Sequence, residues 1–185
     1  MGSTIILDPY DVWRLTAGLQ VSFEALLQDK LELNLVEGII LPNMKTSGEN
    51  ERCGFLNGEG RCSIHALRPG FCRIFPLGRF YENHSFQYFL QVHECPRESK
   101  LKVKVQKWID TPDLKRNEKF IIDWHYFLKD VTARLGGQNG EQYQKMIDLY
   151  ILKSFYQEEW EKDRDFYEQF DERLTKAKEI LKISG

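Results

Sequence analysis

Four cysteines are the residues of this chain most able to do chemistry. Cys53, Cys62, Cys72 and Cys95 are its only thiols, and all four lie within less than a quarter of the 185 residues. Eight, nine and 22 residues separate successive cysteines. Four thiolates are the number that completes a tetrahedral zinc site or holds one iron–sulfur cluster. The sequence therefore predicts a metal centre whose ligands are these four cysteines.

Other interpretations of the cysteines stay open. A zinc ribbon would contain two C-x2-C pairs, and the chain has none, so the spacing alone does not decide. Four buried thiols that bind nothing are the simplest alternative. A disulfide is disfavoured because we expect a cytoplasmic, reducing location. The first eight residues lack the basic start and long apolar run of a secretory signal.

Histidines and arginines lie close to the cysteines in the sequence. His65 follows Cys62 by three positions, and His93 precedes Cys95 by two. Either histidine could ligate a metal, or could instead hydrogen-bond to a residue that does. Arginines would stabilise a negatively charged thiolate centre and lower thiol pKa values, with ordinary surface charge as the alternative. The candidates for supporting the metal ligands are His65, His93, Arg68 and Arg73.

Two helices, a strand and a loop are predicted before the first cysteine. Asp8 and Pro9 mark a helix start, because aspartate caps helices and proline suits the first helical position. A second helix is expected to begin after Ser22, where leucines and a phenylalanine recur at helical spacing. A single short strand is predicted over residues 34–41, followed by a polar surface loop over residues 43–52.

Two hairpins are predicted around the cysteines. In residues 53–62, Asn57 and Gly58 would supply the positive backbone dihedrals of a tight turn, and the hairpin would bring its two terminal cysteines together. Residues 77–92 read as a second hairpin. Its returning arm would deliver the last histidine and cysteine to the neighbourhood of Cys72.

Amphipathic helices are predicted after residue 110. The apolar spacing indicates helices over residues 117–135, 141–156 and 163–183. The expected fold class is α+β and helix-rich, with small β-hairpins around a cysteine cluster packed by helices. We expect a cysteine-cluster metal-binding domain over residues 1–110 and a C-terminal helical extension over residues 111–185.

Charge and hydropathy restrict the partners. The net charge of −2 argues against nucleic acid, whose binding needs a clustered basic excess. No apolar stretch approaches the ~20 residues of a membrane-spanning helix. A protein partner is compatible with the sequence, which does not identify one.

The segment from Cys62 to Pro76 resembles the YkgJ-like cysteine-cluster family, which is described as zinc- or iron-chelating. The family pattern, in words, is a cysteine, a hairpin, a cysteine before a small and an aliphatic residue, Arg-Pro, Cys-Arg and aromatic-Pro. The matching residues here are Cys53, Cys62-Ser63-Ile64, Arg68-Pro69, Cys72-Arg73 and Phe75-Pro76. Cys95 matches a later cysteine of the family. The resemblance covers residues 4–110 and implies zinc or an iron–sulfur cluster as the cofactor.

One departure from the family pattern bears on the ligand set. Members usually carry a further cluster of the C-x2-C-x2/3-C-C kind just before the segment that begins here at residue 4. This sequence has no such cluster after Met1. Either the cluster precedes the present chain and the native site holds more thiols, or this member lacks it and four cysteines make the site alone.

Two classes of function follow from these residues. The first is a metal-binding protein with a structural or chelating role, in which zinc or an iron–sulfur cluster holds the hairpins together. The alternative is a redox or methyltransferase-associated iron–sulfur enzyme component, suggested by a resemblance to the cysteine-cluster domain of flagellin lysine N-methylases. An enzyme would need a convergent acid or base, for which the sequence offers His65, His93 and Tyr88.

Overall fold

The fold is helix-rich α+β, as predicted. The structure, a computed structural model, describes residues 5–48, 52–92, 94, 102–136 and 140–183. Its α-helices are α1 (Pro9–Leu19), α2 (Phe23–Asp29), α3 (Gly70–Ile74), α4 (Val105–Ile109), α5 (Leu114–Gly136), α6 (Glu141–Leu152) and α7 (Phe166–Leu181). A 3-10 turn, η1 (His65–Leu67), precedes α3, and a π-helical turn, η2 (Lys153–Gln157), continues α6.

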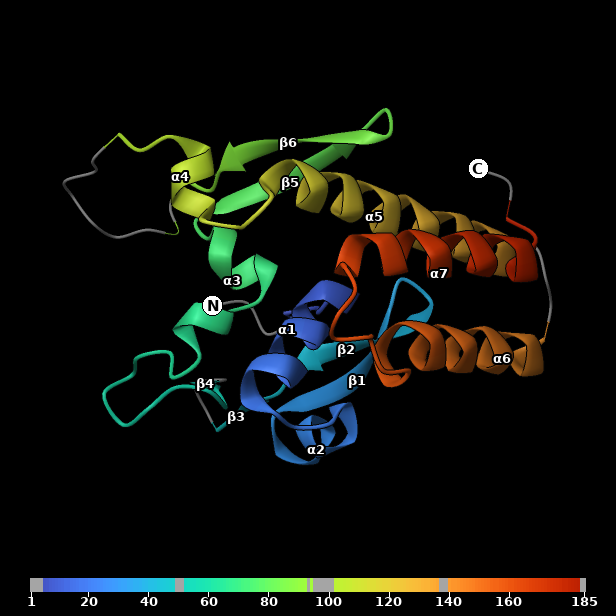
Figure 1. Cartoon of the computed structure of the whole chain (residues 1–185), viewed down its shortest axis with the longest axis horizontal. Helices are drawn as coiled ribbons and strands as arrows, with labels where there is room; N and C mark the ends of the chain where they lie inside the picture. The colour runs from blue at the N-terminus through green and yellow to red at the C-terminus, as the bar shows by residue number, and fades with distance from the viewer. Residues whose placement is uncertain (1–4, 49–51, 93, 95–101, 137–139, 184–185) are drawn as a thin grey trace.

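Six short strands form three separate two-stranded antiparallel sheets. The pairs are β1 (Leu31–Val36) with β2 (Ile39–Met44), β3 (Thr46–Ser47) with β4 (Arg52–Cys53), and β5 (Leu77–Glu82) with β6 (Ser85–Leu90). Figure 1 shows them spread around the helices rather than joined into one sheet. Small hairpins packed by helices were the expected arrangement.

The predicted single strand over residues 34–41 is wrong. Glu37 and Gly38 both have positive φ and form a turn, so the chain folds into a hairpin in which Val36 pairs with Ile39. The strand β2 continues through Pro42 to Met44, so the predicted loop over residues 43–52 also begins too early. Proline is tolerated there because the backbone oxygen of Leu7, whose N–H donates to the oxygen of Pro42 (2.9 Å), accepts from the Tyr156 hydroxyl (3.0 Å) and needs no N–H from residue 42.

The first helix begins where the sequence indicated. The Asp8 side chain accepts a hydrogen bond from the backbone N–H of Asp11 (2.8 Å), and the Asp11 side chain accepts one from the N–H of Asp8 (3.4 Å). This reciprocal capping satisfies two of the donors that a helix start leaves open. The second helix is capped in the predicted way by Ser22 and ends at Asp29, where β1 takes over.

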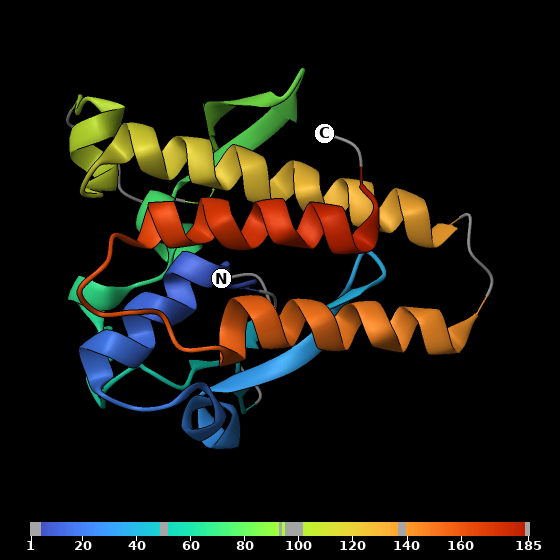
Figure 2. The ribbon, with the colours of Figure 1, turned by 45° about the vertical axis from the view of Figure 1, so that its right-hand side comes forward.

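The three long C-terminal helices lie side by side. Helix α7 lies between α5 and α6 in both views of the ribbon (Figures 1 and 2). Helices α5, α6 and α7 match the three amphipathic segments predicted from the apolar spacing. The β5–β6 hairpin lies along α5, and the ring of Tyr81 stacks on the ring of His125 at a centroid distance of 3.6 Å.

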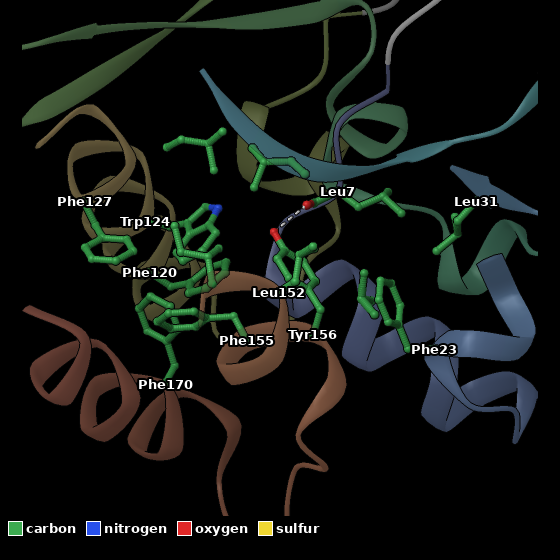
Figure 3. Close-up of a cluster of buried hydrophobic side chains, with 14 of the residues drawn as sticks. Leu7, Phe23, Leu31, Phe120, Trp124, Phe127, Leu152, Phe155, Tyr156 and Phe170 are labelled. Carbon is green, nitrogen blue, oxygen red and sulfur yellow. Dashed lines mark hydrogen bonds between the residues drawn. The ribbon is translucent and has the colours of Figure 1, made fainter. Parts of the chain in front are cut away.

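One aromatic core joins the first helix and strands to these C-terminal helices. Figure 3 shows side chains from α5, α7, η2 and the N-terminal segment meeting in one cluster. The Tyr156 hydroxyl donates a hydrogen bond to the backbone oxygen of Leu7 (3.0 Å) at its centre. The division of the chain at residue 110 stays a prediction, and the helices after that residue share this core with the residues before it.

Candidate metal centre

Three of the four predicted ligands lie in residues 52–92, which we call the thiol segment. Cys53 ends β4, Cys62 forms an isolated antiparallel bridge with Leu56, and Cys72 lies in the short helix α3. All three side chains are half-buried, and none is in a disulfide. Cys95 and His93 lie outside the described residues.

A turn forms between the first two cysteines as predicted, but the cysteines do not pair with each other, because Cys53 pairs with Thr46 and Cys62 with Leu56. Asn57 accepts hydrogen bonds through its side-chain oxygen from the N–H groups of Glu59 (3.0 Å) and Arg61 (2.8 Å). Gly60 has the positive φ of 73°, not Asn57 or Gly58 as we expected. Backbone bonds also close this turn, from the N–H of Gly60 to the oxygen of Asn57 (2.9 Å) and from the N–H of Asn57 to the oxygen of Arg61 (2.8 Å), and its left-handed residue is Gly60.

Helix α1 holds the thiol segment in place through three contacts. The Asp11 carboxylate accepts a hydrogen bond from the N–H of Gly70 (2.8 Å), at the start of the helix that carries Cys72. Arg14 donates to the backbone oxygen of Ala66 (2.6 Å) in the 3-10 turn. At Gly18, a Cβ atom would lie 2.5 Å from the side chain of Leu67, so glycine is what allows the turn to approach the helix.

The Cys72 thiol lies close enough to Cys53 and Cys62 for their charges to affect its pKa. Burial, helped by the charges of Asp11, Cys53 and Cys62, raises the pKa of Cys72 to about 12. Arg68 lowers this pKa, as the sequence predicted for arginines, but its effect is the smaller one. Removal of water from the thiol and nearby negative charge outweigh one guanidinium. A metal ion would have to displace a firmly held proton from Cys72.

The described thiols do not by themselves form a closed ligand set. No group of three or more His, Cys, Asp or Glu side chains that could hold a metal ion occurs among the described residues, which exclude Cys95 and His93. The donor chemistry nevertheless fits a thiolate-binding metal, because three unpaired thiols share one neighbourhood. The role of the four cysteines as ligands therefore stays a prediction.

Three of the predicted supporting residues are described: His65 lies in η1, Arg68 directly follows it, and Arg73 lies in α3. A guanidinium nitrogen of Arg68 lies 3.0 Å from Nε2 of His65. Arg73 is buried and donates to the backbone oxygens of Asp110 (2.8 Å) and Ala66 (2.9 Å). Within the described ranges these side chains brace the turn before Cys72.

Sequence reasoning missed the second role of Asp11. The prediction of this helix start rests on Asp8 and Pro9, yet Asp11 is 4% exposed and its carboxylate also reaches residue 70. Burial raises the pKa of Asp11 to about 6, and burial beside Asp11 raises that of Asp8 well above its ordinary value. A contact across 59 residues leaves no local signal in the sequence.

Hairpins and a short helix carry the three described cysteines of this region. The family model described as "CxxCxxCC: Putative zinc- or iron-chelating domain" matches residues 5–96, about half of the chain. Over these residues the chain belongs to this family of zinc- or iron-chelating domains. No curated protein and no solved structure matches the chain.

Proposed function

We propose that this protein binds zinc or an iron–sulfur cluster through Cys53, Cys62, Cys72 and Cys95, and that the bound metal has a structural or chelating role. The observation that carries the proposal is the donor set itself, three disulfide-free thiols on β4, the following hairpin and α3, near enough for the charges of Cys53 and Cys62 to act on Cys72. Membership of a zinc- or iron-chelating family supports the same chemistry. The metal would supply the cross-link between elements that bury little apolar surface.

The residues around the thiols have defined roles under this proposal. The contact between Asp11 and Gly70 positions the helix that carries Cys72, and Arg14 and Arg73 hold the preceding turn through Ala66. Since thiolates are the binding form, each thiol must release its proton on metal binding. No helix within the described ranges is long and apolar enough to cross a bilayer.

Elemental analysis with a visible spectrum, on protein purified without oxygen, tests the proposal. One zinc per chain without colour would support the structural or chelating role. Iron with acid-labile sulfide and visible absorption would support an iron–sulfur cluster, and would direct attention to the redox alternative. Protein that contains neither metal, and takes up neither on reconstitution, would contradict the proposal.

Serine substitution identifies the ligands. Cys72→Ser should lower bound metal to a small fraction of the wild-type content, because serine is a poor ligand for a soft-metal site. Ser63→Ala is the matched control, since Ser63 follows Cys62 and its hydroxyl donates only to the backbone oxygen of Phe55 (2.8 Å). Unchanged metal in Cys72→Ser would remove this cysteine from the ligand set.

A further inference from the structure

A cationic pocket lies beside the thiol segment. It has a volume of about 430 Å³, within the range of small-molecule sites, and opens between α1, η1, α3 and the turn after α4. Charged and polar side chains dominate its lining. These are Arg14, Arg68, Arg73, His65, Thr111 and Asp110.

Two of the three arginines of this pocket donate to backbone oxygens, and a guanidinium nitrogen of Arg68 lies 3.0 Å from Nε2 of His65. Arg14 and Arg73 both donate to the backbone oxygen of Ala66, at 2.6 and 2.9 Å. The ion pairs found among the described residues involve none of the three arginines. Asp110 holds Arg73 through its backbone oxygen, and its exposed side chain forms none of those ion pairs.

Burial makes this concentration of charge costly. Arg73 is 6% exposed, and the Nε atoms of Arg73 and Arg68 are buried without a hydrogen-bond partner among the described residues. Three guanidinium groups beside one carboxylate, that of Asp110, leave the lining with an excess of positive charge, which favours binding of an anion.

We propose that this pocket binds a dianionic phosphate group. Guanidinium groups bind phosphate through paired, charge-assisted hydrogen bonds, and three of them match a dianion better than a single carboxylate. The pocket volume leaves room for an organic portion beside the phosphate, against Ala66 and Pro112. The ligand class is therefore free phosphate or a small phosphate monoester.

Isothermal titration calorimetry of the full chain at constant ionic strength tests this site. The probes are inorganic phosphate, glycerol 3-phosphate and, as a monoanionic control, acetate. We expect saturable binding of at least one phosphate probe and much weaker binding of acetate. Tighter binding of glycerol 3-phosphate would assign the site to a monoester, and tighter binding of inorganic phosphate to the free ion. Absence of saturable binding of both probes at millimolar concentration would overturn the proposal.

Two variants and a matched control connect the binding to the pocket. Arg14→Gln and Arg68→Gln should each weaken phosphate binding by about tenfold or more, because each removes a charged donor. Arg61→Gln should bind like wild type, since Arg61 is exposed and pairs with Glu59 (3.6 Å) outside the pocket. Wild-type affinity in both pocket variants would overturn the proposal. The metal content of the same samples tests the metal centre independently.

Discussion

The thiol segment and the aromatic core are stabilised in different ways. The apolar side chains that the thiol segment buries are Phe55, Ile64 and Ile74, and its regular elements are two to six residues long. It also leaves large apolar side chains exposed, such as Phe80 at 60%. The core between α1, α5, η2 and α7 buries a dense cluster of aromatic rings. The comparison teaches that the core is stabilised by packing, whereas the thiol segment depends on contacts from α1 and α5 and, in our proposal, on a metal.

Removal of a core ring should have the largest effect on stability. Phe170 is fully buried and packs against Phe120 at a ring-centroid distance of 4.6 Å. Phe170→Ala should lower the free energy of unfolding by about 3–5 kcal/mol, through lost burial and the cavity left behind. Chemical denaturation followed by circular dichroism measures this loss. We expect the same loss with and without a chelator, and a loss confined to the metal-loaded protein would break the comparison.

The buried carboxyl groups of Asp8 and Asp11 should have a smaller effect on the free energy of unfolding, and this effect should depend on pH. Because the pKa values of Asp8 and Asp11 are raised in the folded protein, that state holds more protons than the unfolded chain between about pH 4 and 6. Their contribution to stability should therefore fall as the pH rises through this window. The facing charged and titratable groups are Arg79, Arg14 and Tyr156.

Two substitutions of Asp8 separate its charge from its capping role. Asp8→Asn keeps an acceptor for the N–H of Asp11 and should flatten the decline in melting temperature between pH 4 and 7. Asp8→Ala removes the acceptor and should cost about 1 kcal/mol at pH 5. Thermal melts across this pH range measure both. A wild-type pH profile in Asp8→Asn would show that the acid at position 8 does not contribute to the decline.

Alanine substitutions at two glycines test the turn between the first two cysteines. Among the predictions we expect the smallest effect on stability here. Gly60→Ala should destabilise the hairpin by about 1 kcal/mol, because alanine is strained at a φ of 73°. Through this cost, metal affinity should fall by about fivefold in a competition assay with a chelator. Gly58→Ala is the control, since its φ is not positive and no atom lies within 4 Å of the added Cβ. Equal affinities in the two variants would contradict a role for this turn in positioning the thiols.

Local sequence signals predicted most of the helices and strands. The features that the sequence did not predict depend mainly on contacts between distant residues. The caps at Asp8 and Ser22, and the apolar spacing after residue 110, located the helices correctly. The predicted strand over residues 34–41 failed because its apolar run gave no sign that Glu37 would adopt a positive φ. The cysteines could be found by counting, and the hairpin by its Asn-Gly pair.

The surroundings of the thiols could not be predicted in the same way. The carboxylate of Asp11 reaches Gly70, and the arginines from α1 and α3 meet at Ala66. Both arrangements depend on how α1 packs against the turn, which is a property of the folded chain. The identity of the arginines was visible in the sequence, but their convergence on one pocket was not.

Hydrogen–deuterium exchange of the metal-loaded and chelator-treated protein tests the central claim most directly. We predict that chelation will strongly reduce the protection of amides in the hairpin of residues 53–62 and in α3, while α5 and α7 keep theirs. Unchanged protection of the thiol segment on metal removal, or an equal loss in α5 and α7, would contradict the claim that a metal stabilises the thiol segment and packing stabilises the core.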